Sequence, residues 1–292
     1  MYLLERAEGL HLEDCSSFKN ILSFGARRLN NLRVLSVEKC HDTDEYILSI
    51  TTTTTIVDEA MKKIPQIVFS SLECLYLNEV TKLKAICDSH YPRSPSTNNS
   101  SSLSSLLPPT PMFGNLRLLK IYSCNRLKHI LPMSLAQGLL QLEVLEICGC
   151  RDLEEIFVND LDHNGDEEDI KEKELMMNMG MSKKKVVVFP RLRSLTLDEL
   201  ENVSTMSKGV LSRDNFDWPS LVTLILFHCP NLKRVPLNLH RATKLRNFII
   251  PEEEEEWLNG LEWDDESEKE KALRLVSEMN QVRWLNSLFL NH

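Results

Sequence analysis

The sequence has no long hydrophobic run and no excess of basic charge. No stretch approaches the roughly 18 uninterrupted apolar residues of a membrane-spanning helix, and Glu5, Arg6 and Glu8 interrupt the amino-terminal apolar run too early for a secretory signal. The formal net charge of -9 argues against a general polyanion binder. We therefore expect no membrane span, no nucleic-acid partner and a cytoplasmic location. The basic run Lys183–Lys185 leaves the nucleus possible.

Catalytic motifs are absent as well. The sequence contains no G-x-x-x-x-G-K-[ST], no G-x-G-x-x-G and no H-E-x-x-H. Cys148 and Cys150, with Cys124 or His228 from neighbouring copies of a repeat, are the densest candidate for a metal, but zinc requires four ligands with paired spacing. His228 and Cys229 would suit a Cys–His nucleophile, yet Cys229 occupies a position that the repeat itself explains. We expect no enzyme, no cofactor and no metal.

The sequence does contain a repeated phrase, which is clearest in LEVLEICGCRDLEEI at residues 142–156. The phrase returns at residues 116–130 and 221–235. Leu145 and Ile147 alternate with polar or smaller residues, which is the period of a strand. After Cys150 the apolar residues fall three apart, which favours a turn or a short helical piece behind that strand. One such unit cannot bury its apolar face alone, so it must stack on copies of itself.

The spacing of the copies predicts the fold. Leu145 follows Leu119 by 26 residues and Leu224 follows Leu195 by 29, inside the roughly 20–29 residues of a leucine-rich repeat. We predict an α/β leucine-rich-repeat solenoid, with a curved parallel sheet on its concave face and short helices or turns on its convex face. One short outer helix is expected within LPMSLAQGLLQ, residues 131–141.

The domain organisation follows from the same pattern. About eight irregular repeats are expected over residues 1–256, with a helical tail at 257–292 that caps the array. Insertions interrupt the pattern near 51–64, 88–111 and 159–185, and the last of these is acidic and then rich in methionine. The methionines could form an adhesive partner surface or belong to a loosely ordered loop.

Five of the eight cysteines share one position of the repeat, three residues after the second apolar residue of the strand. They are Cys15, Cys40, Cys124, Cys150 and Cys229. Disulfides would space cysteines by loop topology instead. We interpret these five as small, soft side chains that fill a narrow turn, with a weak S–H donor beside the backbone.

The candidate binding surface is the inner face of the sheet, because a solenoid presents that face to partners. The residues that flank the strand leucines must point there. They are His11 and Glu13, Ser36 and Glu38, Tyr76 and Asn78, Lys120 and Tyr122, Glu146 and Cys148, Thr196 and Asp198, and Ile225 and Phe227. Aromatic residues at Tyr76, Tyr122 and Phe227 are of the type that often contributes binding energy at protein interfaces, although any single position could be merely exposed.

Three phrases and the tail carry a family resemblance. FGNLRLLKIYSCNRLKHILP, LLQLEVLEICGCRDLEEI and WPSLVTLILFHCPNLKRVP, together with the ending WLNGLEWDD, resemble the carboxy-terminal repeats of plant nucleotide-binding, coiled-coil-type disease-resistance receptors. The resemblance implies a module of innate immunity that recognises a protein: a pathogen effector, a modified host protein or a nucleotide-binding domain supplied in trans.

Two alternatives stay open. The sequence shows no phosphate-binding loop and no coiled-coil start, so we expect a fragment or a repeat-only relative without a nucleotide switch of its own. A substrate receptor of a ubiquitin ligase, or a general interaction scaffold, would also use such repeats. That receptor class usually has an amphipathic helical box ahead of the repeats, whereas these begin almost at Met1.

Overall fold

The structure is a computed structural model that describes residues 7–16, 21, 26–48, 69–87, 112–158, 187–207, 216–251 and 255–277. The three expected insertions, near 51–64, 88–111 and 159–185, lie outside the described residues. So do residues 278–292 of the expected tail.

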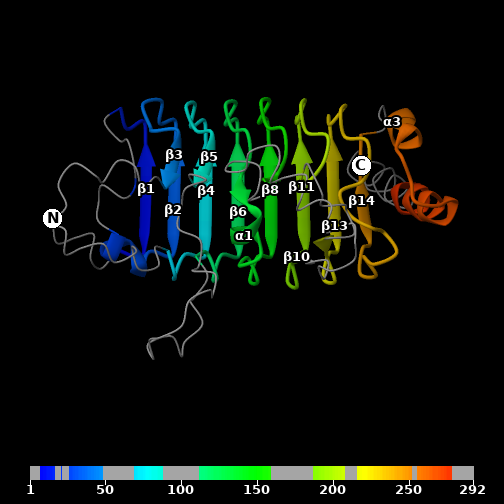
Figure 1. Ribbon diagram of the computed structural model, residues 1–292, viewed down its shortest axis with the longest axis horizontal. Helices are drawn as coiled ribbons and strands as arrows, with labels where there is room; N and C mark the ends of the chain where they lie inside the picture. The colour runs from blue at the N-terminus through cyan, green and yellow to red at the C-terminus, as the bar shows by residue number, and fades with distance from the viewer. Residues whose placement is uncertain are drawn as a thin grey trace, which may run out of the picture.

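Eight parallel strands form the main sheet of the described residues, and they follow one another in space in the order of the chain (Figure 1). They are β1 (Gly9–Glu13), β2 (Val34–Glu38), β4 (Cys74–Asn78), β6 (Leu118–Tyr122), β8 (Val144–Cys148), β11 (Ser194–Asp198), β13 (Thr223–Phe227) and β14 (Asn247–Ile249). Each strand pairs in parallel with the strand of the next repeat, so Leu119 lies beside Leu145 and Leu145 beside Leu195. The predicted solenoid of stacked repeats is confirmed.

Shorter elements follow the main strands. Within the described ranges, three two-stranded parallel pairs join β3 (Tyr46–Leu48) to β5 (Ala85–Cys87), β7 (Leu131–Pro132) to β9 (Phe157–Val158), and β10 (Val187–Val188) to β12 (Phe216–Asp217). The helices among the described residues include the 3-10 helix η3 (Ala26–Asn31), α1 (Met133–Ala136) and α3 (Glu255–Gly260), and residues 266–277 are also helical. Helix α1 lies within residues 131–141, where a short helix was predicted.

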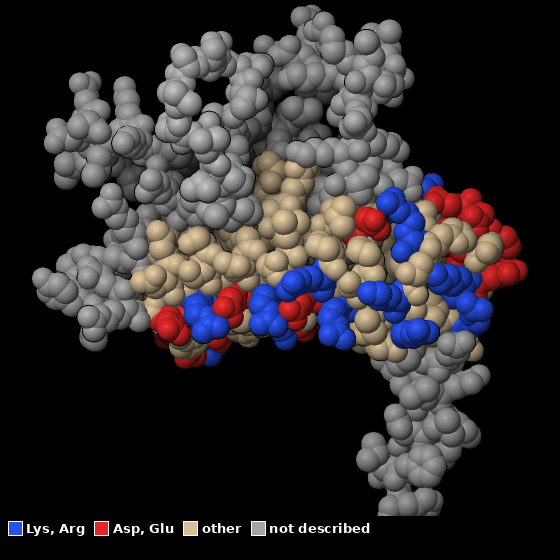
Figure 2. All heavy atoms as spheres, turned by 90° about the horizontal axis from the view of Figure 1, so that it is seen from below, with Lys and Arg blue, Asp and Glu red and all other residues tan. Residues whose placement is uncertain are grey.

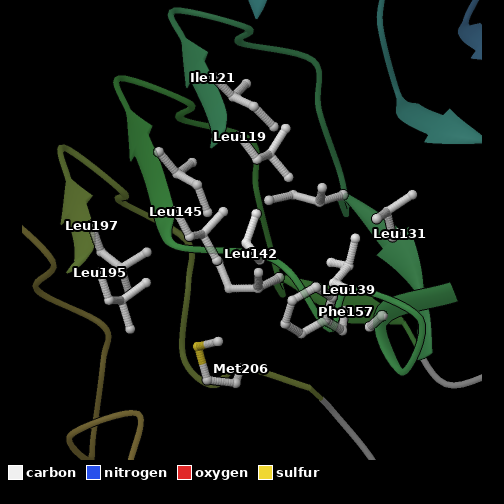
Figure 3. Close-up of a cluster of buried hydrophobic side chains, with 14 of the residues drawn as sticks. Leu119, Ile121, Leu131, Leu139, Leu142, Leu145, Phe157, Leu195, Leu197 and Met206 are labelled. Carbon is white, nitrogen blue, oxygen red and sulfur yellow. The ribbon is translucent and has the colours of Figure 1, made fainter. Parts of the chain in front are cut away.

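The core lies between the main sheet and these shorter elements. Leu119 and Ile121 of β6, and Leu145 and Ile147 of β8, are fully buried. Figure 3 shows such leucines pointing from the strands towards Leu131 and other buried residues of the second layer. The strand alternation read from the sequence is therefore correct, because every residue assigned to the interior of β8 is buried.

A left-handed residue ends most of the main strands. Asp14, Lys39, Glu79, Ser123, Gly149, Glu199 and His228 all have φ between 49° and 66°. In the first six of these residues the backbone N–H donates to the carbonyl of the last strand residue of the next repeat; Ser123 N, for example, lies 2.9 Å from Cys148 O. The sharp turn carries the next residue into the core, where Cys40, Cys124, Cys150 and Cys229 are buried.

Four of the five turn cysteines, Cys15, Cys40, Cys150 and Cys229, donate to nearby backbone carbonyls, as their position in the repeat predicts. Cys40 Sγ lies 3.3 Å from Glu38 O, and Cys229 Sγ lies 3.2 Å from Phe227 O. Cys15, in the first described repeat, is only half-buried. A cysteine suits this position because it is small enough for the turn and still offers the strand end a weak donor.

The described part of the tail contacts the last turns of the array. Glu268, which is fully buried, accepts hydrogen bonds from the N–H groups of Leu239, at 2.8 Å, and Asp264, at 3.2 Å. Lys271 Nζ donates to Leu239 O over 2.6 Å. In the helix at 266–277, Ala272, Leu275 and Val276 are buried, whereas Leu273 is half-buried.

Candidate functional site

The register of the main sheet arranges the candidate residues in two neighbouring rows. The first row runs His11, Ser36, Tyr76, Lys120, Glu146, Thr196 and Ile225, and the second runs Glu13, Glu38, Asn78, Tyr122, Cys148, Asp198 and Phe227. Neighbours in a row are about 4.8 Å apart, the spacing of paired strands. We call the surface formed by the outward residues of the main strands the open face.

The open face contains a third row, which was not predicted from the sequence. Each five-residue strand has three outward positions, and the first of them adds Gly9, Val34, Cys74, Leu118, Val144, Ser194 and Thr223. Strand β14 extends the face with Asn247 and Ile249. The alternation along each strand also places its first residue outward. Leu118 and Val144 nevertheless look like core residues in the sequence, because they are apolar and stand directly before the buried leucines.

The amino-terminal part of the open face is a small network of charged groups. Glu13 lies 3.2 Å from Lys39 Nζ, and the ring nitrogens of His11 lie 3.6 Å from carboxylate oxygens of Glu13 and Glu38. Ser36 Oγ donates to Glu38 over 2.8 Å. The hydrogen bond from Lys39 is the main cause that lowers the pKa of Glu13 below its usual value. These groups are largely satisfied by one another.

Two tyrosines mark the centre. The rings of Tyr76 and Tyr122 lie 5.5 Å apart at an angle of 49°. Burial, and then a hydrogen bond to Glu146, raise the pKa of Tyr122. Burial alone would raise the pKa of Glu146, but hydrogen bonds from Lys120 and Tyr122 lower it below its usual value. Lys120 Nζ lies 2.8 Å from the Glu146 carboxylate. The centre is therefore a fixed aromatic pair beside a fixed charge pair.

The face becomes less charged towards the carboxy terminus, where Ile225, Phe227 and Ile249 are outward residues. The rings of Phe227 and His228 meet edge to face at 6.3 Å. His228 Nδ1 lies 3.4 Å from an oxygen of Asp198. Aliphatic and aromatic side chains at half-buried positions offer apolar area to a partner.

Burial disfavours nucleophilic chemistry at the cysteine thiols on the open face and in the turns behind it. Burial, with the nearby carboxylates of Glu146 and Asp198, raises the pKa of Cys148 to about 12. A hydrogen bond with Cys124, and then burial, raise the pKa of Cys150. Cys229 is buried and directs its thiol at Leu197 O and Phe227 O. Among the described residues, no group of three or more His, Cys, Asp or Glu side chains could hold a metal ion.

This arrangement defines a leucine-rich-repeat protein: each repeat contributes one parallel strand, and in six of the eight strands two buried aliphatic residues, the first of them leucine, alternate with outward residues. The comparisons with known proteins then identify the family. Residues 96–248, slightly more than half of the chain, match the family described as plant disease resistance protein RPS2-like, leucine-rich repeats. The chain belongs to this family, as its resemblance predicted.

Two relatives illustrate the match. The disease resistance protein SUMM2 of Arabidopsis thaliana is 30% identical over 166 residues, which cover 57% of this chain and 16% of that protein. The putative disease resistance protein At5g05400 of the same plant is 29% identical over 190 residues, covering 64% of this chain and 19% of that protein. The chain thus spans less than a fifth of the length of either relative. Across the described ranges, no helix is both long and apolar enough to cross a membrane.

Proposed function

We propose that this chain is a recognition module of plant innate immunity that binds another protein through the open face. The partner would be a pathogen effector, a modified host protein or a nucleotide-binding domain in trans. Recognition would take place in the cytoplasm, without catalysis by this chain. The proposal rests on the family and on the side chains of the face.

The observation that carries the proposal is the aromatic pair at the centre of an ordered face. Tyr76 and Tyr122 are held against each other, and Tyr122 is fixed further by Glu146. Tyrosine supplies a large contact area at a low cost in conformational entropy, and it is enriched among the residues that dominate binding energy. A pair that is already ordered loses little freedom when a partner docks.

The dimensions of the face suit a protein better than a small molecule. Seven strand intervals and strands of about five residues give a surface of about 34 Å by 16 Å. That area is on the order of 500 Å², and the adjacent turns enlarge it towards the roughly 800 Å² that one partner contributes to a standard interface. Ile225, Phe227 and Ile249 would form the apolar part of the contact.

A comparative capture from plant tissue tests this function. The immobilised wild-type chain should retain a protein that neither of two single variants, Tyr122→Ala and Phe227→Ala, retains. Lys128→Ala is the matched control, because Lys128 is exposed in a turn outside the open face and pairs with Glu154 over 3.2 Å. The retained protein should then bind each purified open-face variant at least tenfold more weakly than it binds the purified wild-type chain. Retention that is equal in all four proteins would contradict the proposal.

A further inference from the structure

A second charged row runs along the edge of the sheet where the strands begin. The residue immediately before each main strand belongs to this row, which reads Glu8, Arg33, Glu73, Arg117, Glu143, Arg193, Val222 and Arg246. Each backbone N–H of the row donates to the carbonyl of the preceding member, over 2.7 to 2.9 Å. We call it the entry row. Its members are direct neighbours although the chain separates them by a whole repeat.

The first half of the entry row neutralises itself. Acidic and basic residues alternate from Glu8 to Arg193. Arg33 donates two hydrogen bonds, of 2.9 and 3.0 Å, to the carboxylate of Glu73. Arg117 also binds Glu143 through two nitrogens, but both approach one carboxylate oxygen, with Nε at 3.0 Å and Nη2 at 2.9 Å. Here a guanidinium fork is matched to a carboxylate on the neighbouring strand.

The alternation fails in the second half. Val222 occupies the place where the pattern calls for an acid, between Arg193 and Arg246. Arg191 and Lys244, two residues upstream of these arginines, add two further cations, and all four cationic side chains are exposed. Within the described part of the chain, no carboxylate pairs with any of the four. Figure 2 shows the change, with red and blue alternating along one part of this edge and blue prevailing further on.

The surface is hollow at this place. Arg191, Arg193 and Lys244 line a hollow of about 500 Å³ together with Ser220, Val222 and the paired Arg117 and Glu143. The carboxylate that lines the hollow is already paired, because Glu143 lies 2.9 Å from Arg117. We call Arg191, Arg193, Lys244 and Arg246, around Val222, the basic edge.

We infer that the basic edge binds a short acidic segment of a partner polypeptide, whose carboxylates take the place of the acid missing at position 222. The chain shows the chemistry in its own first half, where each arginine fork holds a glutamate. An extended segment of about three residues spans the two strand intervals, roughly 10 Å, between Arg193 and Arg246. Exposed cations would also steer such a segment towards the edge.

A nucleic acid fits this edge less well than a short acidic peptide. A duplex carries one charge per roughly 1.7 Å over its whole length, and it would pass from the basic edge onto carboxylates. Figure 2 shows red side chains beyond the blue group in both directions. The net charge of the whole chain is -9, which repels a long polyanion. A short segment avoids both penalties.

Fluorescence anisotropy with a defined probe tests the inference. The probe is a labelled peptide with four consecutive glutamates, and its counterpart has four glutamines. The wild-type chain should bind the glutamate peptide at low ionic strength, more tightly than the glutamine peptide, and lose affinity as salt is added. The double variant Arg193→Gln, Lys244→Gln should bind at least tenfold more weakly.

Val222→Glu is the sharpest variant. It restores the missing acid within the chain, so the new carboxylate should pair with Arg193 or Arg246 and reduce binding of the glutamate peptide at least tenfold. Arg33→Gln is the matched control, since it removes one positive charge from the self-neutralised half, and it should bind within twofold of the wild type. Thermal melts verify folding, and the exposed double variant decides the matter if Val222→Glu does not fold.

Three results would overturn the inference. The first is equal binding of the glutamate and glutamine peptides, or binding of neither. The second is unchanged affinity in the double variant. The third is tighter binding of a single-stranded oligonucleotide of equal charge than of the glutamate peptide, which would make the edge a nucleic-acid surface. Because these variants lie outside the open face, this inference and the proposed function can fail separately.

Discussion

Replacing Leu145 with alanine should destabilise the protein by about 2–5 kcal/mol. Leu145 is fully buried and lies in register between Leu119 and Leu195, which are also fully buried. The change removes three carbons, each of which contributes about 0.8 kcal/mol when buried. The remaining cost comes from the cavity, because neighbours on both sides are anchored in their own strands and collapse only partly (Figure 3).

Glu146→Ala is the matched comparison, one residue further along the same strand. It removes the contact with Lys120 at 2.8 Å and the hydrogen bond from Tyr122. Partly exposed pairs of this kind contribute about 0.2–1 kcal/mol, so the loss should stay below about 1 kcal/mol.

Urea unfolding followed by far-ultraviolet circular dichroism measures both variants. The urea midpoints are compared only where the denaturant dependence of the unfolding free energy is the same, because a repeat array need not unfold in a single step. The Leu145→Ala midpoint should fall well below that of the wild type, and the Glu146→Ala midpoint should stay close to it. Equal shifts, or a larger shift for Glu146→Ala, would mean that the strand faces are assigned the wrong way round.

Three further outcomes are expected. Gly149→Ala should lower the free energy of unfolding, followed in a thermal melt, by about 1 kcal/mol or more, since Gly149 has φ +66° and a left-handed backbone disfavours a Cβ. Ser123 occupies the same repeat position and already has a Cβ, so Ser123→Ala should leave the stability nearly unchanged. Iodoacetamide should alkylate Cys148 at least about 30-fold more slowly in the folded than in the urea-denatured protein at pH 8, because its pKa of about 12 leaves little thiolate; peptide mass spectrometry that found similar rates would refute this. Glu268→Ala should cost about 1–3 kcal/mol in a urea melt, because Leu239 N–H loses its buried acceptor, and an unchanged midpoint would exclude a stabilising role for the tail contact.

The fold was predictable because one period repeats. Leu145 and Ile147 have counterparts in every regular copy, so their alternation indicated the strand and their spacing indicated the register. The cysteine position could be read in the same way. The buried positions recur in the same order in each regular repeat, since every repeat must bury the same kind of apolar face.

The left-handed turn was not predictable from composition. Lys39, Glu79 and Glu199 belong to no residue type that favours positive φ, whereas Gly149 does. The backbone hydrogen bond to the next repeat, rather than the side chain, holds this conformation. Stacking of the repeats imposes this backbone conformation, so the sequence of a single repeat hardly reveals it.

The charged surfaces were only partly predictable. The two open-face rows were found because they flank the strand leucines, whereas the third row was hidden behind apolar residues such as Leu118. The Arg33–Glu73 pair joins residues 40 positions apart, across residues that interrupt the period. Such neighbours become visible only when the register is known, and so does the missing acid at Val222.

Photo-crosslinking from single positions tests the central claim most directly. A benzoylphenylalanine would replace Tyr122 or Phe227 on the open face, or Lys128 in the turn outside it, and the chain would be irradiated in extracts of plant tissue. The account predicts that positions 122 and 227 form an adduct with the same protein and that position 128 forms none. Adducts from position 128 alone, or from no position, would contradict recognition through the open face.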